Sequence, residues 1–324
     1  MSKLPLRSSL AVIKTVMKNI SHLRMRNVSG TPISIIPIPF NEKVRSTRDT
    51  GHAPAYLEKH GLSRALTSLG FSVNAHPAIT HGEMARMVSS TRSAVGSRLR
   101  HREKCIALGG THAVALGTIG GALDVFGSEL GVIWIDAHGD LNTHKTSPTG
   151  DVSGMVLAAL LGVGERSLTD LVPKKLRAKN LLHIGLKDAD SGEIALVERR
   201  GLTVVTIANI AAGGLVDCAK HTRGLARRAK QVWVSLDVDS IDENDAPASP
   251  MASRGGLTYR DVTNLMRHIG NTCNVVGLDI VEIAPKKDVR GKTARLCIEL
   301  AASAFGAVHN WYKAEYLPHS RLSA

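Results

Sequence analysis

Aromatic side chains are scarce in this chain of 324 residues, since phenylalanine, tryptophan and tyrosine together make up 3%. So few rings argue against a surface that stacks the bases of single-stranded nucleic acid. Long apolar runs are also missing, and none reaches the roughly 18 residues that a transmembrane helix needs. We therefore expect neither a nucleic-acid partner nor a membrane-spanning segment.

Cysteine is rarer still. The four cysteines are Cys105, Cys218, Cys273 and Cys297, and no two of them form a CxxC pair. This spacing argues against a thiolate metal site. Cys105 and Cys297 lie in apolar contexts, where a free thiol packs like a small hydrophobe. Few cysteines without a pairing pattern are typical of a protein in a reducing compartment.

Acidic residues are absent before Glu42. Residues 4–26 place apolar side chains at helical spacing, with lysines and arginines between them. A basic amphipathic helix that lacks acids and contains serines is typical of a mitochondrial transit peptide. We therefore expect residues 1–28 to be a transit peptide and the protein to lie in the mitochondrial matrix. The alternative is a surface helix or a basic tail on a cytoplasmic protein.

The net charge is +13, and six of the basic residues fall within the first 26 positions. The other basic residues are spread along the chain, and no basic stripe is interleaved with aromatics. This distribution is typical of a solvated surface rather than of a nucleic-acid interface.

Short apolar runs alternate with helical stretches from residue 29 onward. Strands are expected at 34–39, 105–108, 131–136, 181–186, 204–207, 232–236 and 275–280. Helices are expected at 57–69, 83–99, 112–126, 155–161, 192–200, 216–230, 259–268 and 293–305. The runs are continuously apolar, as in strands buried on both faces of a parallel sheet. The alternation predicts one doubly wound α/β domain over residues 29–324, with a central, mainly parallel sheet flanked by helices.

Candidate metal ligands follow three of these strands. GGTH follows the strand at 105–108, DAHGD ends the strand at 131–136, and DVD follows the strand at 232–236. The carboxyl ends of parallel strands form one edge of the sheet, so these side chains should converge there. They are His112, Asp136, His138, Asp140, Asp237 and Asp239.

Imidazole and carboxylate ligands together suit Mn²⁺ and similar metals. Six such ligands are more than one ion needs, but they suit two ions bridged by carboxylates and a water. Four buried carboxylates without cations would repel one another. A lone DxD is often a helix cap or a Mg²⁺–phosphate site, and a lone histidine is often an ordinary packed residue. The three motifs together favour a two-metal centre.

Five stretches of the sequence resemble the arginase (ureohydrolase) family. They are LGGTHA at 108–113, WIDAHGDLN at 134–142, SLDVD at 235–239, GGLTYR at 255–260 and GLDIVE at 277–282. The last expected helix is also similar, and the resemblance covers about residues 32–307. It implies a single α/β domain, two Mn²⁺ ions per chain and a homotrimer.

The resemblance also implies roles for the candidate ligands. His112 and Asp140 would hold one ion, His138 and Asp239 would hold the other, and Asp136 and Asp237 would bridge them. The implied reaction is the hydrolysis of the guanidinium group of L-arginine to L-ornithine and urea by a metal-bridging hydroxide. Asp140 would accept a hydrogen bond from this hydroxide, and Glu282 would orient the guanidinium group.

Substrate contacts carry over in the same way. Asn142 and Thr149 match positions that hold the substrate α-carboxylate, and Asp190 matches the carboxylate that meets the α-amino group. Asp188 and Glu193 match neighbours of that site. The alternative for Asp190 is an N-cap of the helix that starts near Gly192.

Four positions depart from the family pattern. Thr111 stands where the family usually has aspartate, Asp151 where arginases usually have asparagine, and Met251 where a threonine is usual. Ser153 occupies the catalytic position of the histidine that carries a proton to the leaving amine, and serine transfers protons poorly near neutral pH. His144 could replace that histidine, or it could be a solvated loop residue.

Three functions therefore stay open. The first is a manganese-dependent arginase, which these departures could make slow. The second is a hydrolase of another guanidino compound, such as agmatine or guanidinobutyrate, because Asp151 would repel a carboxylate. The third is a non-catalytic, metal-stabilised protein that binds a guanidino ligand or a partner chain.

Overall fold

The computed structural model describes residues 28–41 and 49–307. The predicted transit peptide, except for Val28, lies outside the described residues. In the described part of the chain, no helix combines the length and apolar character needed to cross a membrane. All four cysteines are buried and free, and for Cys105 and Cys297 their apolar neighbours predicted this.

A single sheet of eight parallel strands forms the centre of the molecule, in the order β2-β1-β3-β8-β7-β4-β5-β6. The strands are β1 (Pro32–Ile38), β2 (Ser72–Ala75), β3 (Lys104–Gly109), β4 (Leu130–Ile135), β5 (Leu181–Leu186), β6 (Thr203–Thr206), β7 (Gln231–Asp237) and β8 (Val275–Val281). The inner strands β3, β4, β7 and β8 are almost entirely buried. These strands are continuously apolar because helices cover both faces of the sheet, so nearly every side chain along them is buried.

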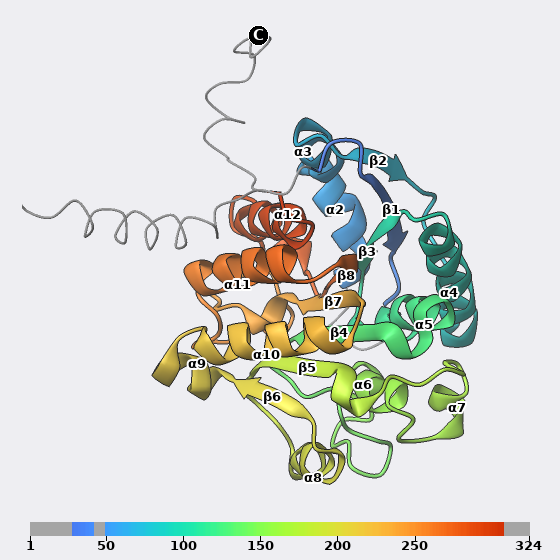
Figure 1. The fold of residues 1–324 in the computed structure, drawn as a ribbon, viewed down its shortest axis with the longest axis vertical. Helices are drawn as coiled ribbons and strands as arrows, with labels where there is room; N and C mark the ends of the chain where they lie inside the picture. Colours follow the sequence, from blue (N-terminus) through green and yellow to red (C-terminus); the bar gives the residue numbers. More distant parts are fainter. Residues whose placement is uncertain (1–27, 42–48, 308–324) are drawn as a thin grey trace, which may run out of the picture.

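Two layers of helices enclose the sheet. The helices are α2 (Ala53–Lys59), α3 (Leu62–Ser68), α4 (Met84–Arg100), α5 (Ala115–Phe126), α6 (Val156–Leu160), α7 (Arg166–Thr169), α8 (Ser191–Arg200), α9 (Ile207–Gly213), α10 (Val216–Arg228), α11 (Tyr259–Thr272) and α12 (Lys292–Ala304). Figure 1 shows α10, α11 and α12 on one face and α4 and α5 on the other. Each layer has its own apolar core against the sheet, so the predicted single α/β domain is confirmed.

The local predictions failed where the chain gives weak signals. The expected helix at 57–69 is two helices, because Gly61 adopts φ +90° and breaks it. Strand β2 was not predicted, since it lies at the sheet edge and its residues are half-buried or exposed. Helix α9 was also missed; it begins at a capping box formed by Thr206 and Asn209.

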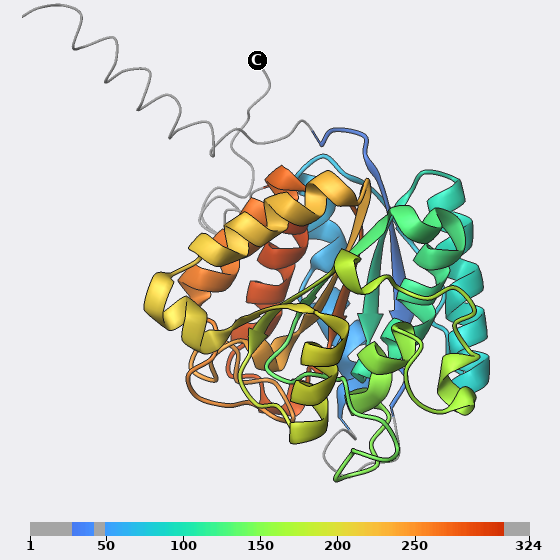
Figure 2. The ribbon, with the colours of Figure 1, turned by 60° about the horizontal axis from the view of Figure 1, so that its bottom comes forward.

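The fold places the metal-ligand motifs at one edge. Strands β3, β8, β7 and β4 are consecutive neighbours in the sheet. In Figure 2 the strand arrows point toward the bottom of the view, where the green loop that follows β4 lies. The strand ends at this edge carry the predicted site.

Candidate metal centre

The structure brings all six predicted metal ligands together. The loop after β3 contributes His112, the end of β4 and its loop contribute three ligands, and the end of β7 contributes two. Five of the six are buried, whereas the side chain of His138 is 34% exposed. The cluster is therefore internal, with His138 on its solvent side.

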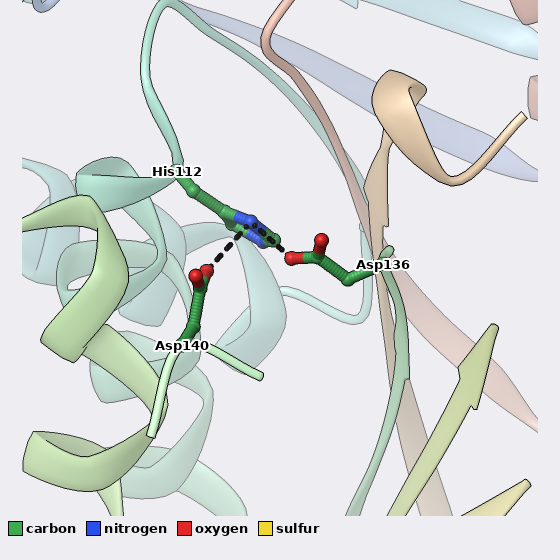
Figure 3. Close-up of side chains that lie close together, drawn as sticks. All are labelled: His112, Asp136 and Asp140. Atoms are coloured by element: carbon green, nitrogen blue, oxygen red, sulfur yellow. Dashed lines mark ion pairs between the residues drawn. The ribbon is translucent and has the colours of Figure 1, made fainter. Parts of the chain in front are cut away.

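Three carboxylates face one nitrogen of His112. Its Nδ1 lies 3.1 Å from Asp136 Oδ2, 3.2 Å from Asp140 Oδ2 and 3.3 Å from Asp237 Oδ2. Figure 3 shows the ring between the first two of these carboxylates. A nitrogen and several carboxylate oxygens at such separations form a pocket of the size and chemistry that Mn²⁺ prefers.

A second group forms around His138. Its Nδ1 lies 3.0 Å from Asp239 Oδ2 and 3.7 Å from Asp136 Oδ1. Asp136 therefore belongs to both groups, one oxygen toward each histidine. This is the placement that a bridging carboxylate between two ions requires.

The cluster is electrostatically unbalanced without cations. Burial lowers the pKa of His112, but the surrounding carboxylates outweigh it and hold that pKa well above its ordinary value. Burial, with the charges of Asp239 and Asp136, raises the pKa of Asp237 well above its usual range. Among the described residues, His112 Nδ1 and Asp140 Oδ2 are buried without a hydrogen-bond partner. Bound cations would satisfy both atoms and neutralise the carboxylates, so the residues fit a two-metal centre.

Two of the four non-glycine residues with positive φ in the described part of the chain lie in this cluster. Asp140 has φ 51° and Glu282 has φ 58°, in the left-handed region that non-glycine residues rarely adopt. The Oε1 atom of Glu282 accepts a hydrogen bond from the backbone N–H of His112 at 2.9 Å, so Glu282 is anchored beside the first ligand. Burial raises the pKa of this carboxyl to about 8. A guanidinium cation beside it would favour its charged form.

A cavity of about 510 Å³ opens over the cluster. Its wall includes ligands from both groups, Glu282 and the other predicted site residues, together with three of the departures from the family pattern. These further wall residues are Asn142, Thr149, Asp151, Ser153, Asp188, Asp190, Glu193 and Met251. The fourth departure, Thr111, is buried beside His112, and its hydroxyl has no hydrogen-bond partner among the described residues.

The structure confirms the N-cap alternative for Asp190, and its contact with a substrate α-amino group stays a prediction. Asp190 precedes α8 and forms a capping box with Glu193, whose Oε2 accepts a hydrogen bond from the Asp190 N–H at 2.8 Å. Its own Oδ2 accepts a hydrogen bond from Asn142 Nδ2 at 2.8 Å. Asp190 therefore caps the N-terminus of α8 and also fixes a neighbouring wall residue.

His144 lies away from this cavity. Its Nε2 is 3.2 Å from Glu165 Oε1, and both residues line a different, small pocket. The structure therefore favours the solvated loop residue over the substitute for the shuttle histidine.

Two residues near the centre were not predicted. Trp134 stacks on the His112 ring, with 4.0 Å between centroids and 9° between planes, and its Nε1 donates to Asp136 Oδ2 at 3.0 Å. The sequence contained one signal for this contact. The chain has only three tryptophans, and one of them lies beside the DAHGD motif. Lys187 lines the cavity, and its Nζ donates to Ser253 Oγ at 3.0 Å.

Comparison with known proteins gives consistent matches. The model of the arginase family matches residues 31–306. An arginase from Bacillus caldovelox is 31% identical over 295 residues, which cover 85% of this chain and 98% of that protein. The crystal structure of arginase from Bacillus cereus superposes with a TM-score of 0.80 at 30% identity, covering 85% of this chain and 98% of that one. An agmatine ureohydrolase of Thermoplasma volcanium shares the fold, with a TM-score of 0.68 at 20% identity over 91% of this chain and 96% of that one.

Proposed function

Because the chain belongs to the arginase family, we propose that it hydrolyses the guanidinium group of L-arginine to L-ornithine and urea at a two-manganese centre. The observation that carries this proposal is the convergence of six metal-ligand side chains, five of which line one cavity together with the anchored Glu282. When bound, the ions supply Lewis acidity and an activated water.

The residues of the chain would hold the ions, orient the guanidinium group and orient the attacking water. We assign one ion to His112 and Asp140, the other to His138 and Asp239, and the bridging positions to Asp136 and Asp237. Glu282 accepts hydrogen bonds from the guanidinium N–H groups and so orients its carbon toward the centre. Asp140 accepts a hydrogen bond from the attacking water, which aims its lone pair at that carbon.

The far end of the substrate is assigned to the cavity wall. Asn142 and Thr149 are placed to donate hydrogen bonds to the α-carboxylate, and Asp190 to accept one from the α-amino group. Ser153 stands where a proton donor to the leaving amine is needed, and its hydroxyl is a weak acid at neutral pH. We therefore expect a slow enzyme.

Two further predictions accompany this proposal. The basic, acid-poor segment 1–28 supports a location in the mitochondrial matrix. The resemblance to the family supports a homotrimer. Both stay predictions.

The test combines metal content with urea release. The purified protein is loaded with Mn²⁺, its bound metal is counted, and urea is measured with arginine, agmatine and 4-guanidinobutyrate. We expect two ions per chain and urea from arginine, and in the Asp237→Asn variant fewer bound ions and no urea. Two ions with no urea from any substrate would contradict the proposed activity and favour the non-catalytic alternative.

The acidic wall favours a second candidate, hydrolysis of a guanidino compound that has no carboxylate. Asp151, Asp188 and Asp190 all line the cavity, and its one lysine, Lys187, lies 3.5 Å from Asp188 Oδ2, which leaves the wall with a net negative charge. The Asn142 amide already donates to Asp190. A second cationic group would be attracted where an α-carboxylate would be repelled.

The Asp151→Asn variant separates these two candidates. If Asp151 repels the α-carboxylate, the substitution raises kcat/KM for arginine relative to agmatine by about tenfold, which corresponds to roughly 1.4 kcal/mol. Asp188→Asn is the matched control, because Asp188 lies on the same wall. Equal changes for both substrates in Asp151→Asn would show that this carboxylate does not select the substrate.

A further inference from the structure

Among the residues that the structure describes, Met251 is the largest apolar side chain on the wall of the cavity over the metal centre. It is 56% exposed. The other apolar side chains of this wall, Pro148 and Ala189, are smaller, and most of the remaining wall residues are charged or polar. A large apolar side chain left open to water beside a cavity is stabilised when an apolar part of a ligand covers it.

A turn presents Met251 to the cavity. The Ala252 N–H donates to Ser249 O at 3.4 Å, which closes the turn, and the Met251 N–H donates to Ser249 Oγ at 3.2 Å. Lys287 Nζ donates to two carbonyl oxygens of the turn, Ser249 O at 3.1 Å and Pro250 O at 2.9 Å. The backbone that carries Met251 is therefore fixed before a ligand arrives, and little ordering is needed on binding.

The two sides of this turn are tied to opposite ends of the proposed substrate position. Before the turn, Ala248 O accepts a hydrogen bond from the Ala284 N–H at 2.8 Å. Ala284 lies two residues beyond Glu282, which we assign to the guanidinium group. After the turn, Ser253 Oγ accepts a hydrogen bond from Lys187 Nζ at 3.0 Å, and Lys187 lies three residues before the carboxylate that we assign to the α-amino group. The turn therefore runs beside the part of the cavity that the methylene chain of a substrate would cross.

We propose that Met251 is a specificity-determining residue, which packs against the methylene chain of a guanidino substrate and selects compounds with a long chain over short ones. The inference rests on the proposed function and narrows its substrate class to a guanidinium group joined to a polar end through several methylenes. An unbranched, polarisable thioether adapts to chains of different length. A short compound such as guanidinoacetate would leave Met251 uncovered.

The contact is tested by binding rather than by turnover. Methyl-, propyl-, butyl- and pentylguanidine are titrated into the manganese-loaded protein, and their affinities are measured by calorimetry. These ligands combine the guanidinium group with a chain of increasing length, and they have no polar end that the acidic wall could attract or repel.

Three variants separate the chain contact from other effects. Met251→Thr replaces the apolar side chain with a short polar one, and Met251→Leu keeps an apolar side chain of similar size. Val289→Thr is the matched control, because Val289 is an apolar residue with a similar exposure, 59%, and does not line the cavity.

We expect the affinity of the unchanged protein to rise roughly two- to fourfold with each added methylene, as methylenes become buried. Met251→Thr should flatten this rise, so that pentylguanidine binds about tenfold more weakly while methylguanidine binds equally well. Met251→Leu should keep most of the rise, and Val289→Thr should keep all of it.

An equally steep rise in Met251→Thr would overturn the proposal, as would an equal loss of affinity for methylguanidine and pentylguanidine. If Met251→Thr does not fold, Met251→Gln, which keeps the side-chain length but makes its end polar, gives the same comparison. Binding that rises with chain length, without urea from any guanidino substrate, would contradict the proposed activity and leave this inference standing.

Discussion

At the scale of single residues, Ser153 is the side chain that we propose limits the protonation of a leaving amine. It lines the cavity over the metal centre and begins a 3₁₀ turn (Ser153–Met155). This turn is held against the cavity wall, because Gly154 O accepts a hydrogen bond from the Asn142 N–H at 3.0 Å. Water in the cavity can deliver a proton in place of a side chain, but without a group whose pKa is near neutral the step is slower.

Replacing this serine should therefore accelerate the reaction. For a substrate confirmed to be turned over, we expect Ser153→His to raise kcat by about 10²- to 10⁴-fold, the usual contribution of a general acid–base group. The rate should also gain a pH dependence near the histidine pKa, about 6.5. Steady-state kinetics over about pH 5–8, a range that brackets that pKa, measure both effects.

Ser147→His is the matched control, since Ser147 lies on the wall of the same cavity. It should leave kcat and the pH profile unchanged. No gain in Ser153→His, or an equal gain in both variants, would show that this position does not carry the leaving-group proton.

At the scale of elements, one carboxylate joins α8 to the loop that carries the metal ligands. Glu193 Oε1 accepts a hydrogen bond from the Leu141 N–H at 3.0 Å, and its Oε2 accepts one from the Asp190 N–H at 2.8 Å. The side chain is buried against Gly139, where a Cβ atom would lie 2.6 Å from Glu193 Oε1. The glycine of DAHGD is needed because the helix approaches so closely.

Adding a methyl group there should loosen this junction. Gly139→Ala forces Glu193 to move and weakens both hydrogen bonds, so we expect a loss of about 1–3 kcal/mol in the free energy of unfolding. Urea denaturation of the metal-loaded protein measures it. Gly154→Ala is the control, because no heavy atom of the described residues would lie within 4 Å of its Cβ. Equal stability of the two variants would contradict this account of Glu193.

At the scale of the whole molecule, the metal centre links strands from both halves of the sequence. Its ligands come from the ends of β3, β4 and β7, and Glu282 follows β8. Ions that bind only the folded chain stabilise it in proportion to the logarithm of their concentration. Without ions, the four buried carboxylates are held together against their mutual repulsion.

Metal removal should therefore lower Tm. With free Mn²⁺ at about 1,000 times its Kd, the stabilisation per site approaches roughly 4 kcal/mol. Thermal unfolding with Mn²⁺ and with chelator measures the difference. In Asp237→Asn we expect a smaller gain from Mn²⁺ and an equal or higher Tm in chelator, because one buried like charge is gone. A Tm that does not respond to Mn²⁺ in the unchanged protein would exclude the predicted centre.

The ligand motifs and the strands that precede them could be predicted from local patterns in the sequence. Each ligand motif directly follows a continuously apolar strand, and parallel strands end at a common edge, so the convergence of His112, Asp136 and Asp237 could be predicted. The helix break at Gly61 and the edge strand β2 were not predicted. Strand propensity is a weak signal where side chains are only partly buried, as they are in β2.

The order of the strands in the sheet could not be predicted from these patterns and is known from the folded chain. The placement of β8 between β3 and β7 brings Glu282 to the backbone of His112 and sets Asp279 opposite Ser235. The packing of the loop after β4 against the segment before α7 brings His144 to Glu165, away from the cavity. These contacts join residues far apart in the chain, and they depend on how the helical layers pack on the sheet. No local pattern encodes that packing, because it is a property of the whole core.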